Sequence, residues 1–322
     1  MAISQNLMKK EFIFEANTTV AQCHAATVVA LNNGTVVSAF FAGSAEGKND
    51  VSIWGTRRVN GKWEPPFRIT DDDGFPHWNP VLFSVDGKSL ILYYKVGHKI
   101  SEWKTYYKTS SDNGQSWSEA KELVEGDNSG GRGPVKNKPI LVNNRLITPA
   151  STESGSWRCF ADVFENGFWV KKSMPVASAQ EDLGLIQPTL WQSEDGSLHA
   201  LMRSNKGFVY KTDSTDFGNT WCECYPTNMP NNNSGIDCVG VGEKLLLVCN
   251  PVSKNWGTRS PLTLFLSSDN GKNFTKLLDL ECGEGEFSYP SIIHKDGKIY
   301  IVYTYKREKV AFCEIDMCDL AR

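Results

Sequence analysis

The chain has 322 residues, of which 40% are apolar and 22% are charged, and its formal net charge is −3. This slight negative charge gives no support to a nucleic-acid partner or an anionic membrane surface. No apolar run reaches the length that spans a bilayer, and residues 1–10 lack the apolar core of a signal peptide, so we expect a cytoplasmic protein.

The nine cysteines are an odd number, and several lie in strand-like runs, such as Cys159, Cys238, Cys249 and Cys313. We interpret them as reduced core residues, and we expect no disulfide, no metal site and no cofactor. Cys222 and Cys224 have the spacing of neither a zinc ligand pair nor a redox pair.

Predicted strands follow one another from the first apolar run to the last. Glu11–Phe14 has no hairpin before it, and Val310–Ile315 has no turn motif after it. Between them, pairs of apolar runs enclose Asp-Gly turns, as in 80–83 with 90–94, 188–191 with 198–202 and 290–293 with 299–303. β-branched and aromatic residues around such turns predict hairpins. We expect the first and last runs to pair, because that closes a ring of sheets without exposed edges.

A turn motif recurs among these hairpins. Ser110–Trp117 has the pattern Ser-x-Asp-x-Gly-x-x-Trp, which returns in Ser214–Trp221 and, with a terminal Phe, in Ser267–Phe274. Asn60–Trp63 and Glu165–Trp169 are degenerate copies, and the terminal aromatic residues are spaced by 54, 52, 52 and 53 positions. Repeats of about 40 to 50 residues indicate propeller blades. The sequence therefore predicts one domain over residues 1–322, an all-β six-bladed propeller of four-stranded antiparallel sheets.

Polar side chains occupy the points where the predicted inner strands enter and leave the channel. The residues before the strands are Asn79, Lys138, Gln187 and Tyr289, and the exits include Lys95, Glu153, Arg203, Asn250 and Tyr303. Such groups converging from several blades are typical of a pocket for a charged, hydroxylated sugar.

The repeated turns resemble the Asp-boxes of the sialidase-like (neuraminidase) superfamily of six-bladed propellers, over the whole chain. Sialidases hold the substrate carboxylate with three arginines and attack with a Tyr that a Glu assists, while an Asp near the first blade acts as acid/base. The resemblance implies that Arg203, which ends the run Asp195–Met202, is the second arginine. It implies that Arg259, ahead of Leu262–Ser267, is the third, and that Tyr289 is the nucleophile.

The sequence departs from the sialidase pattern at three points. His24 stands where the first arginine is expected, and Gln187 stands where the assisting Glu is expected. Because an amide takes no proton from a phenol, another acid such as Glu153 or Asp237 would have to serve Tyr289. The loop 45–50 corresponds to the acid/base loop and offers Glu46 and Asp50.

Two histidines are further catalytic candidates. His24 and His77 each precede a turn glycine by ten residues, at the channel end of adjacent inner strands. A neutral imidazole is a competent acid or base near pH 7.

Two polar segments, Gly130–Lys138 and Pro230–Asp237, are candidates for ligand contact through cations and amides. The predicted substrate-binding set is Arg203, Arg259, Arg132, Lys138, Gln187, Asn79, Glu153 and Asp237.

Three functional hypotheses remain open at this stage. The main one is an exo-acting glycosidase that acts on acidic oligosaccharides with a terminal carboxylated sugar, either sialic acid or a uronate. The second is a lyase that cleaves beside a uronate by His/Tyr β-elimination. The third is a glycan-binding propeller without catalytic activity.

Overall fold

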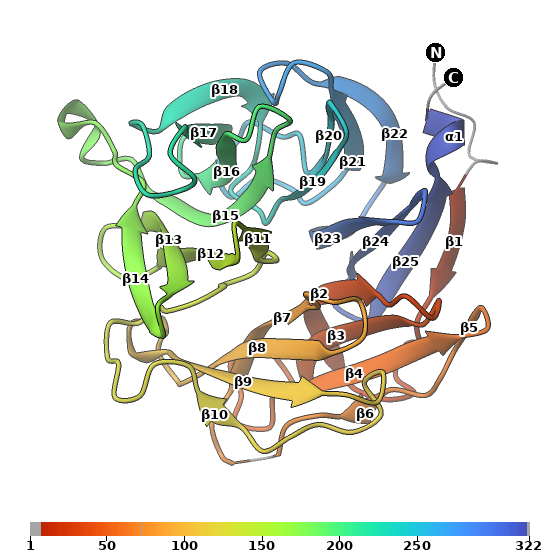
Figure 1. The fold of residues 1–322 in the computed structure, drawn as a ribbon. Coiled ribbons are helices and arrows are strands. Elements are labelled where there is room, and N and C mark those ends of the chain that lie inside the picture. The colour runs from red at the N-terminus through yellow and green to blue at the C-terminus, as the bar shows by residue number, and fades with distance from the viewer. Residues whose placement is uncertain (1–7, 72, 321–322) are drawn as a thin grey trace.

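The computed structural model describes residues 8–71 and 73–320, which form six antiparallel sheets around a central axis (Figure 1). The prediction of a six-bladed propeller of four-stranded sheets is confirmed. Blade 1 contains β2 (Gln22–Ala30), β3 (Val36–Gly43), β4 (Ser52–Val59), β5 (Lys62–Trp63) and β6 (Phe67–Arg68), of which the last two both pair with β4. Blade 2 contains β7 (His77–Phe83), β8 (Leu90–Val96), β9 (Lys104–Ser110) and β10 (Lys121–Glu122).

The other four blades follow in chain order. Blade 3 contains β11 (Ile140–Val142), β12 (Arg145–Thr152), β13 (Arg158–Glu165) and β14 (Phe168–Ser173). Blade 4 contains β15 (Leu185–Gln192), β16 (Leu198–Ser204), β17 (Phe208–Ser214) and β18 (Tyr225–Pro230). Blade 5 contains β19 (Asp237–Val241), β20 (Lys244–Cys249), β21 (Leu262–Ser267) and β22 (Thr275–Glu281). Blade 6 contains β23 (Phe287–Lys295), β24 (Lys298–Tyr305), β25 (Lys309–Asp316) and, from the other end of the chain, β1 (Met8–Phe12).

The helical elements are short. Within residues 8–71 and 73–320 they are two 3₁₀ turns, Ile100–Glu102 and Ser178–Gln180, and the helix α1 (Met317–Leu320). Among the residues that the structure describes, none forms a helix long and apolar enough to cross a membrane.

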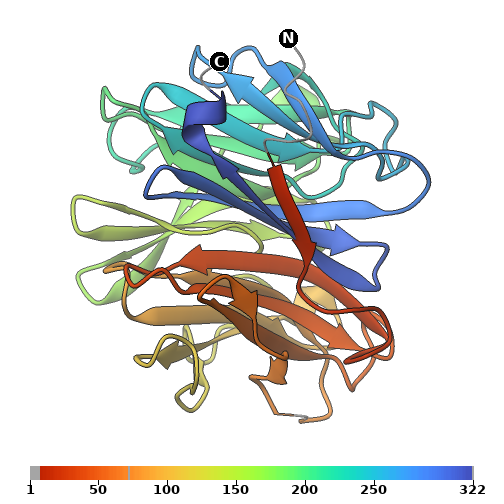
Figure 2. The same ribbon diagram turned by 90° about the vertical axis from the view of Figure 1, so that its right-hand side faces the viewer.

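The ring closes through the pairing of the first and last strands, as the sequence predicts. β1 lies antiparallel to β25, with Glu11 opposite Phe312 and Phe12 opposite Ala311 (Figure 2). This pairing supplies the fourth strand of blade 6 and covers an edge that would otherwise be open to another chain.

The core lies between the blades rather than in one central mass. Five clusters of buried apolar side chains each join two neighbouring sheets. The aromatic residues that end the turn motifs, Trp117, Trp221 and Phe274, pack into three of these clusters. Between blades 2 and 3 lies a buried polar network instead, which includes Lys95, Arg132 and Asp162.

The repeated turns share one hydrogen-bond pattern. In the first, Asp112 accepts hydrogen bonds from the backbone amides of Gln115 and Ser116, both at 3.0 Å, while Gly114 has a φ of 82°. The hydroxyl of Ser116, which donates to Asp112 at 2.6 Å, and these amides lower the pKa of Asp112 to about 2. The corresponding Asp216 and Asp269 also have a pKa of about 2. Since the turns follow the third strand of a blade, they lie at the end opposite to the entry of the innermost strand.

All nine cysteines are free thiols, and six of them are buried. Burial raises the pKa of Cys238 and Cys313 to about 12, so these thiols are protonated at neutral pH.

Candidate functional site

Backbone strain gathers at one end of the channel. Four innermost strands carry a β-bulge near their entry, and at each bulge one residue other than glycine has a positive φ. These residues are Ala25, Asn79, Gln187 and Tyr289, with φ values of 54°, 43°, 54° and 53°. Such a conformation costs about 1–3 kcal/mol per residue and is concentrated at functional sites, where a bulge re-aims a side chain. This end of the channel is therefore the candidate site.

Tyr289 is the centre of the hydrogen bonds at this end. Arg203 donates from Nη1 to the Tyr289 phenol oxygen at 2.9 Å, and Gln187 donates from Nε2 to the same oxygen at 3.5 Å. Arg203 also donates to Oε1 of Gln187 at 3.0 Å. The ring centroids of His24 and Tyr289 are 4.2 Å apart. Side chains from blades 1, 4 and 6 thus meet at one phenol.

A second arginine approaches the same ring. The guanidinium carbons of Arg259 and Arg203 lie 5.5 Å and 5.8 Å from the Tyr289 ring centroid. Arg259 donates to Glu286 at 2.6 Å, and Arg203 donates from Nε to Asn233 at 2.9 Å. Two guanidinium groups that share so small a volume favour an anionic ligand between or beside them.

Arg307 is a third cation at the mouth, which sequence reasoning missed. It lies in the turn between β24 and β25, has a φ of 61°, and donates from Nε to Glu286 at 2.9 Å. It also forms an ion pair with Glu46. His24, Glu46 and Arg307 line one small pocket, so this arginine lies beside the histidine that replaces the expected first arginine. No motif marks it, because it is 283 positions away from His24 in the chain.

His24 is held as a neutral imidazole. Its burial lowers its pKa well below 6.5, and the charges of Arg307 and Arg259 lower it further. Its Nδ1 atom lies 2.8 Å from the Thr304 hydroxyl. Since the same burial and charges oppose protonation, this imidazole is a weak base at neutral pH, although it lies against the Tyr289 ring.

Glu153 reaches Tyr289 only through Gln187. Gln187 donates from Nε2 to Oε1 of Glu153 at 3.1 Å. Burial raises the pKa of Glu153, while the Arg203 charge acts in the opposite direction. Glu153, a candidate base for Tyr289, is therefore linked to the phenol oxygen through the side-chain amide of Gln187.

Asp50 and His77, two further catalytic candidates, each contact residues of the loop beside them. Asp50 accepts hydrogen bonds from the backbone amide and hydroxyl of Ser44, both at 2.9 Å, and so closes its own loop. His77 contacts the Thr70 hydroxyl through Nδ1 at 2.7 Å and Asp73 through Nε2 at 3.3 Å. Its ring lies 5.3 Å from that of Tyr94.

Three predicted substrate-binding residues have partners within the protein. Arg132 forms a bidentate ion pair with the buried Asp162, at 2.8 Å and 3.1 Å. Lys138 donates to both carboxylate oxygens of Asp237 at 2.9 Å. The first pair ties the segment before β11 to β13 of its own blade, and the second joins that segment to β19 of blade 5.

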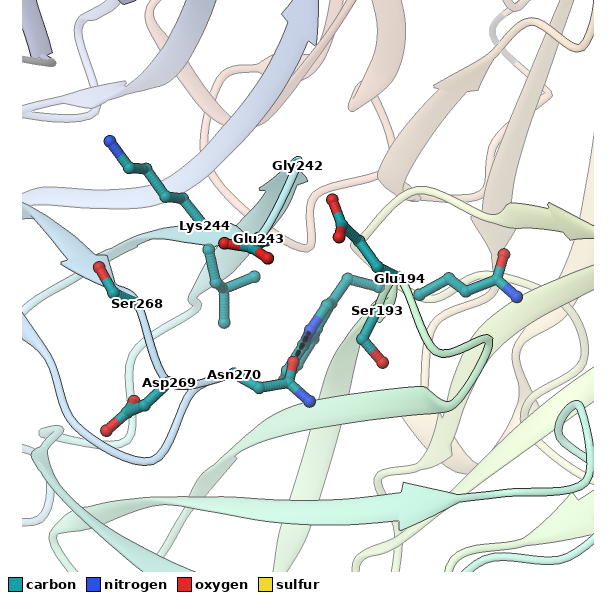
Figure 3. Close-up of a pocket in the computed structure, with 11 residues that line it drawn as sticks. Ser193, Glu194, Gly242, Glu243, Lys244, Ser268, Asp269 and Asn270 are labelled. Carbon is teal, nitrogen blue, oxygen red and sulfur yellow. Dashed lines mark hydrogen bonds between the residues drawn. The ribbon is translucent and has the colours of Figure 1, made fainter.

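A hollow of about 330 Å³ lies at the opposite end, between blades 4 and 5 (Figure 3). Glu194 extends from the turn after β15 and Glu243 from the turn between β19 and β20, while Asp269 and Asn270 belong to a turn motif. Its acidic lining disfavours an anionic sugar, in contrast to the cationic mouth at Tyr289.

The repeat pattern matches a known family across most of the chain. Residues 34–301 match the model of the BNR repeat-like domain. The chain belongs to this family. No curated protein matches its sequence.

Solved structures show that this BNR repeat-like protein shares its fold with sialidases. Trypanosoma rangeli sialidase, in a covalent complex with 2,3-difluorosialic acid, superposes with a TM-score of 0.79 at 15% identity. That match covers 99% of this chain but 60% of the sialidase. A Hadza microbial sialidase superposes with a TM-score of 0.77 at 15% identity, and the match covers 96% of this chain and 68% of the sialidase. A Dyadobacter fermentans protein of unknown function superposes with a TM-score of 0.76 at 13% identity, and the match covers 96% of this chain and 99% of that protein.

Proposed function

We propose that this BNR repeat-like protein is a sialidase-type glycosidase that releases a terminal sialic acid from oligosaccharides. The observation that carries the proposal is the phenol of Tyr289, which accepts a hydrogen bond from Arg203 at 2.9 Å and has Arg259 over its ring. The proposed nucleophile and two guanidinium groups suited to a carboxylate thus lie together at one end of the channel. The likeness to sialidase structures agrees with this reading but does not carry it, because the identities are only 13–16%.

In this proposal the arginines bind the carboxylate of the sugar. A guanidinium group matches a carboxylate with two parallel hydrogen bonds, which a lysine does not. Arg259 and Arg307 both donate to Oε1 of Glu286, which holds their guanidinium groups side by side. The sugar carboxylate then lies among Arg203, Arg259 and Arg307.

The chemistry uses Tyr289 as the nucleophile. Its oxygen attacks the anomeric carbon, the bond to the leaving oxygen breaks, and Glu46 or Asp50 supplies the proton to that oxygen. Water then cleaves the tyrosyl–sugar bond, and this tyrosine route is a recognised exception among glycosidases. Gln187 accepts no proton, and the lowered pKa of His24 makes that imidazole a weak base. We therefore assign stabilisation of the ionised phenol to Arg203 and Arg259, while solvent takes its proton.

β-Elimination beside a uronate is the second candidate. The ring contact between His24 and Tyr289 favours it, since that reaction needs one group to remove a proton from carbon and another to protonate the leaving oxygen. Both candidates need an anionic sugar at the same arginines.

One assay separates the candidates. The protein is incubated with 3′-sialyllactose and with uronate oligosaccharides, and the products are followed by mass and by the absorbance of an unsaturated uronate. Hydrolysis adds water and elimination does not. If neither product forms while calorimetry detects binding of either oligosaccharide, the protein is a glycan-binding propeller and the enzymatic proposal is wrong.

A further inference from the structure

Three consecutive residues of the segment before β11 extend into the channel from blade 3. They are Lys136, Asn137 and Lys138, and the first two are buried, with 6% and 1% of their surface exposed. Sequence reasoning assigns this segment to ligand contact. In the structure, Lys136 and Asn137 contact backbone carbonyls of other blades, and Lys138 contacts the Asp237 carboxylate and the Cys238 carbonyl.

Lys136 contacts the bulge of blade 6. Its Nζ donates to the carbonyl of Pro290 at 2.6 Å, to that of Ile236 at 3.0 Å and to the side chain of Asn137 at 2.8 Å. Three acceptors satisfy the three donors of an ammonium group. Since Pro290 follows Tyr289 directly, this contact holds the peptide unit between Pro290 and Ser291, one residue beyond the strained tyrosine.

Asn137 makes the equivalent contact with the bulge of blade 4. Its Nδ2 donates to the carbonyl of Gln187 at 3.1 Å and to that of Pro188 at 3.0 Å. Adjacent residues of one blade thus hold the two bulges whose side chains share a hydrogen bond at the Tyr289 phenol.

Close packing leaves little freedom at this contact. A Cβ atom added to Gly235 would come within 2.7 Å of Cε of Lys136 and 3.1 Å of Cδ2 of Tyr289. The lysine stem, the tyrosine ring and the backbone at Gly235 therefore fill the same space, and a shift of one displaces the others.

We propose that Lys136 and Asn137 are positioning residues, a clamp from blade 3 that holds Gln187 and Tyr289 in their left-handed conformations. Residues other than glycine adopt this conformation only where the surroundings impose it. The clamp sets the separation of the Tyr289 oxygen from Arg203 and Gln187, and its consequence for turnover rests on the proposed function.

The test uses Lys136→Met and Asn137→Ala, with Lys108→Met as the matched control. Lys108 is also buried, and its Nζ donates to the Ile69 carbonyl at 3.1 Å in blade 2. Thermal unfolding shows that each variant folds. Turnover of 3′-sialyllactose then gives kcat and KM, and crystal structures give the φ of Tyr289.

We expect kcat to fall about 100-fold in each clamp variant, because a displacement of about 1 Å at a reacting group costs this much. KM should change less than about threefold, since Arg203 and Arg259 remain, and Lys108→Met should keep both constants. A folded clamp variant with the kcat of the wild type overturns the proposal. If Lys136→Met does not fold, Asn137→Ala decides by itself.

The crystal structures keep the two proposals apart. If the wild type turns over no sialoside or uronate, the proposed function fails, while the clamp is still judged by geometry. We expect the φ of Tyr289 or Gln187 to leave the left-handed region in the matching variant. Unchanged φ values and an intact Tyr289–Arg203 hydrogen bond in both variants would refute the clamp.

Discussion

Arg203 and Tyr289 share a hydrogen bond of 2.9 Å, although 86 residues and two blade steps separate them. Under the proposed function, Arg203 would therefore contact both the sugar carboxylate and the attacking oxygen. A guanidinium group beside a phenol favours negative charge on the phenol oxygen.

Replacement of the phenol tests its role as nucleophile. Tyr289→Phe should lower kcat on 3′-sialyllactose by about 10⁶-fold, because no oxygen remains to attack the anomeric carbon. Binding of the inhibitor DANA, measured by calorimetry, should change little, since both arginines stay. Turnover at the wild-type rate would exclude Tyr289 from the chemistry.

Gln187→Glu restores the carboxylate that sialidases have at this position. The new group would lie about where Nε2 now is, 3.5 Å from the phenol oxygen, and would accept its proton. We expect hydrolysis to increase. A lower kcat together with unchanged release of unsaturated uronate would favour elimination instead.

Arg203→Met should weaken the binding of sialic acid. A hydrogen bond to a charged group contributes about 1.5–3 kcal/mol, so we expect the Kd to rise about 10- to 150-fold. Arg145→Met is the control, because Arg145 pairs with Glu165 at the opposite end of blade 3. Equal affinity of the Arg203 variant and the wild type in calorimetry would place the carboxylate elsewhere.

Lys95 predicts a dependence of stability on alkaline pH. It is fully buried between blades 2 and 3, and burial lowers its pKa to about 7, against 10.5 for an exposed lysine. Between these values the unfolded chain binds the proton and the folded chain does not, so the free energy of unfolding rises with pH from 7 to about 10.

One such lysine raises the free energy of unfolding by at most about 1.4 kcal/mol per pH unit. Urea unfolding at several pH values should show a shallower rise in Lys95→Met than in the wild type. Lys108→Met serves as the comparison, and parallel curves for Lys95→Met and wild type would contradict the assignment.

The carboxylates of the turn motifs predict how the free energy of unfolding changes at acid pH. Asp269 has a pKa lowered to about 2 by hydrogen bonds within its turn, including a 2.8 Å bond from the amide of Asn273. Its contribution to stability is complete above about pH 4 and is lost as the pH falls through 2. Asp269→Asn should therefore flatten the unfolding curve between pH 4 and 2, while Glu119→Gln, at an exposed carboxyl, should not.

Ring closure predicts the effect of truncation. Deletion of residues 1–12 removes β1 and exposes the edge of β25, together with the apolar surface that Phe12 covers. We expect a lower unfolding temperature and association of the truncated chains, visible in size-exclusion chromatography. Deletion of residues 1–7 keeps β1 and should leave both properties unchanged.

Local sequence determined the architecture. The turn motif specifies its own conformation, because the Asp112 carboxylate accepts hydrogen bonds from amides three and four residues ahead and Gly114 supplies the positive φ. Alternating apolar runs around Asp-Gly turns fix the hairpins, and the regular spacing of the motif fixes the number of blades. The resemblance to sialidases, rather than a local pattern, singled out Arg203, Arg259 and Tyr289, and the structure brings these side chains together.

Only the tertiary structure decided which long side chains meet across the channel. Arg307 lies beside His24, Lys136 holds the bulge at Tyr289, and Lys138 pairs with Asp237 rather than standing free. These contacts join residues about 100 to 283 positions apart, so no short-range pattern encodes them. They depend on the rotation of each blade about the axis and on the direction that each bulge gives its side chain. A buried charged group is stable only when it is paired or hydrogen-bonded, so each of these side chains pairs with a group that the closed ring brings close to it.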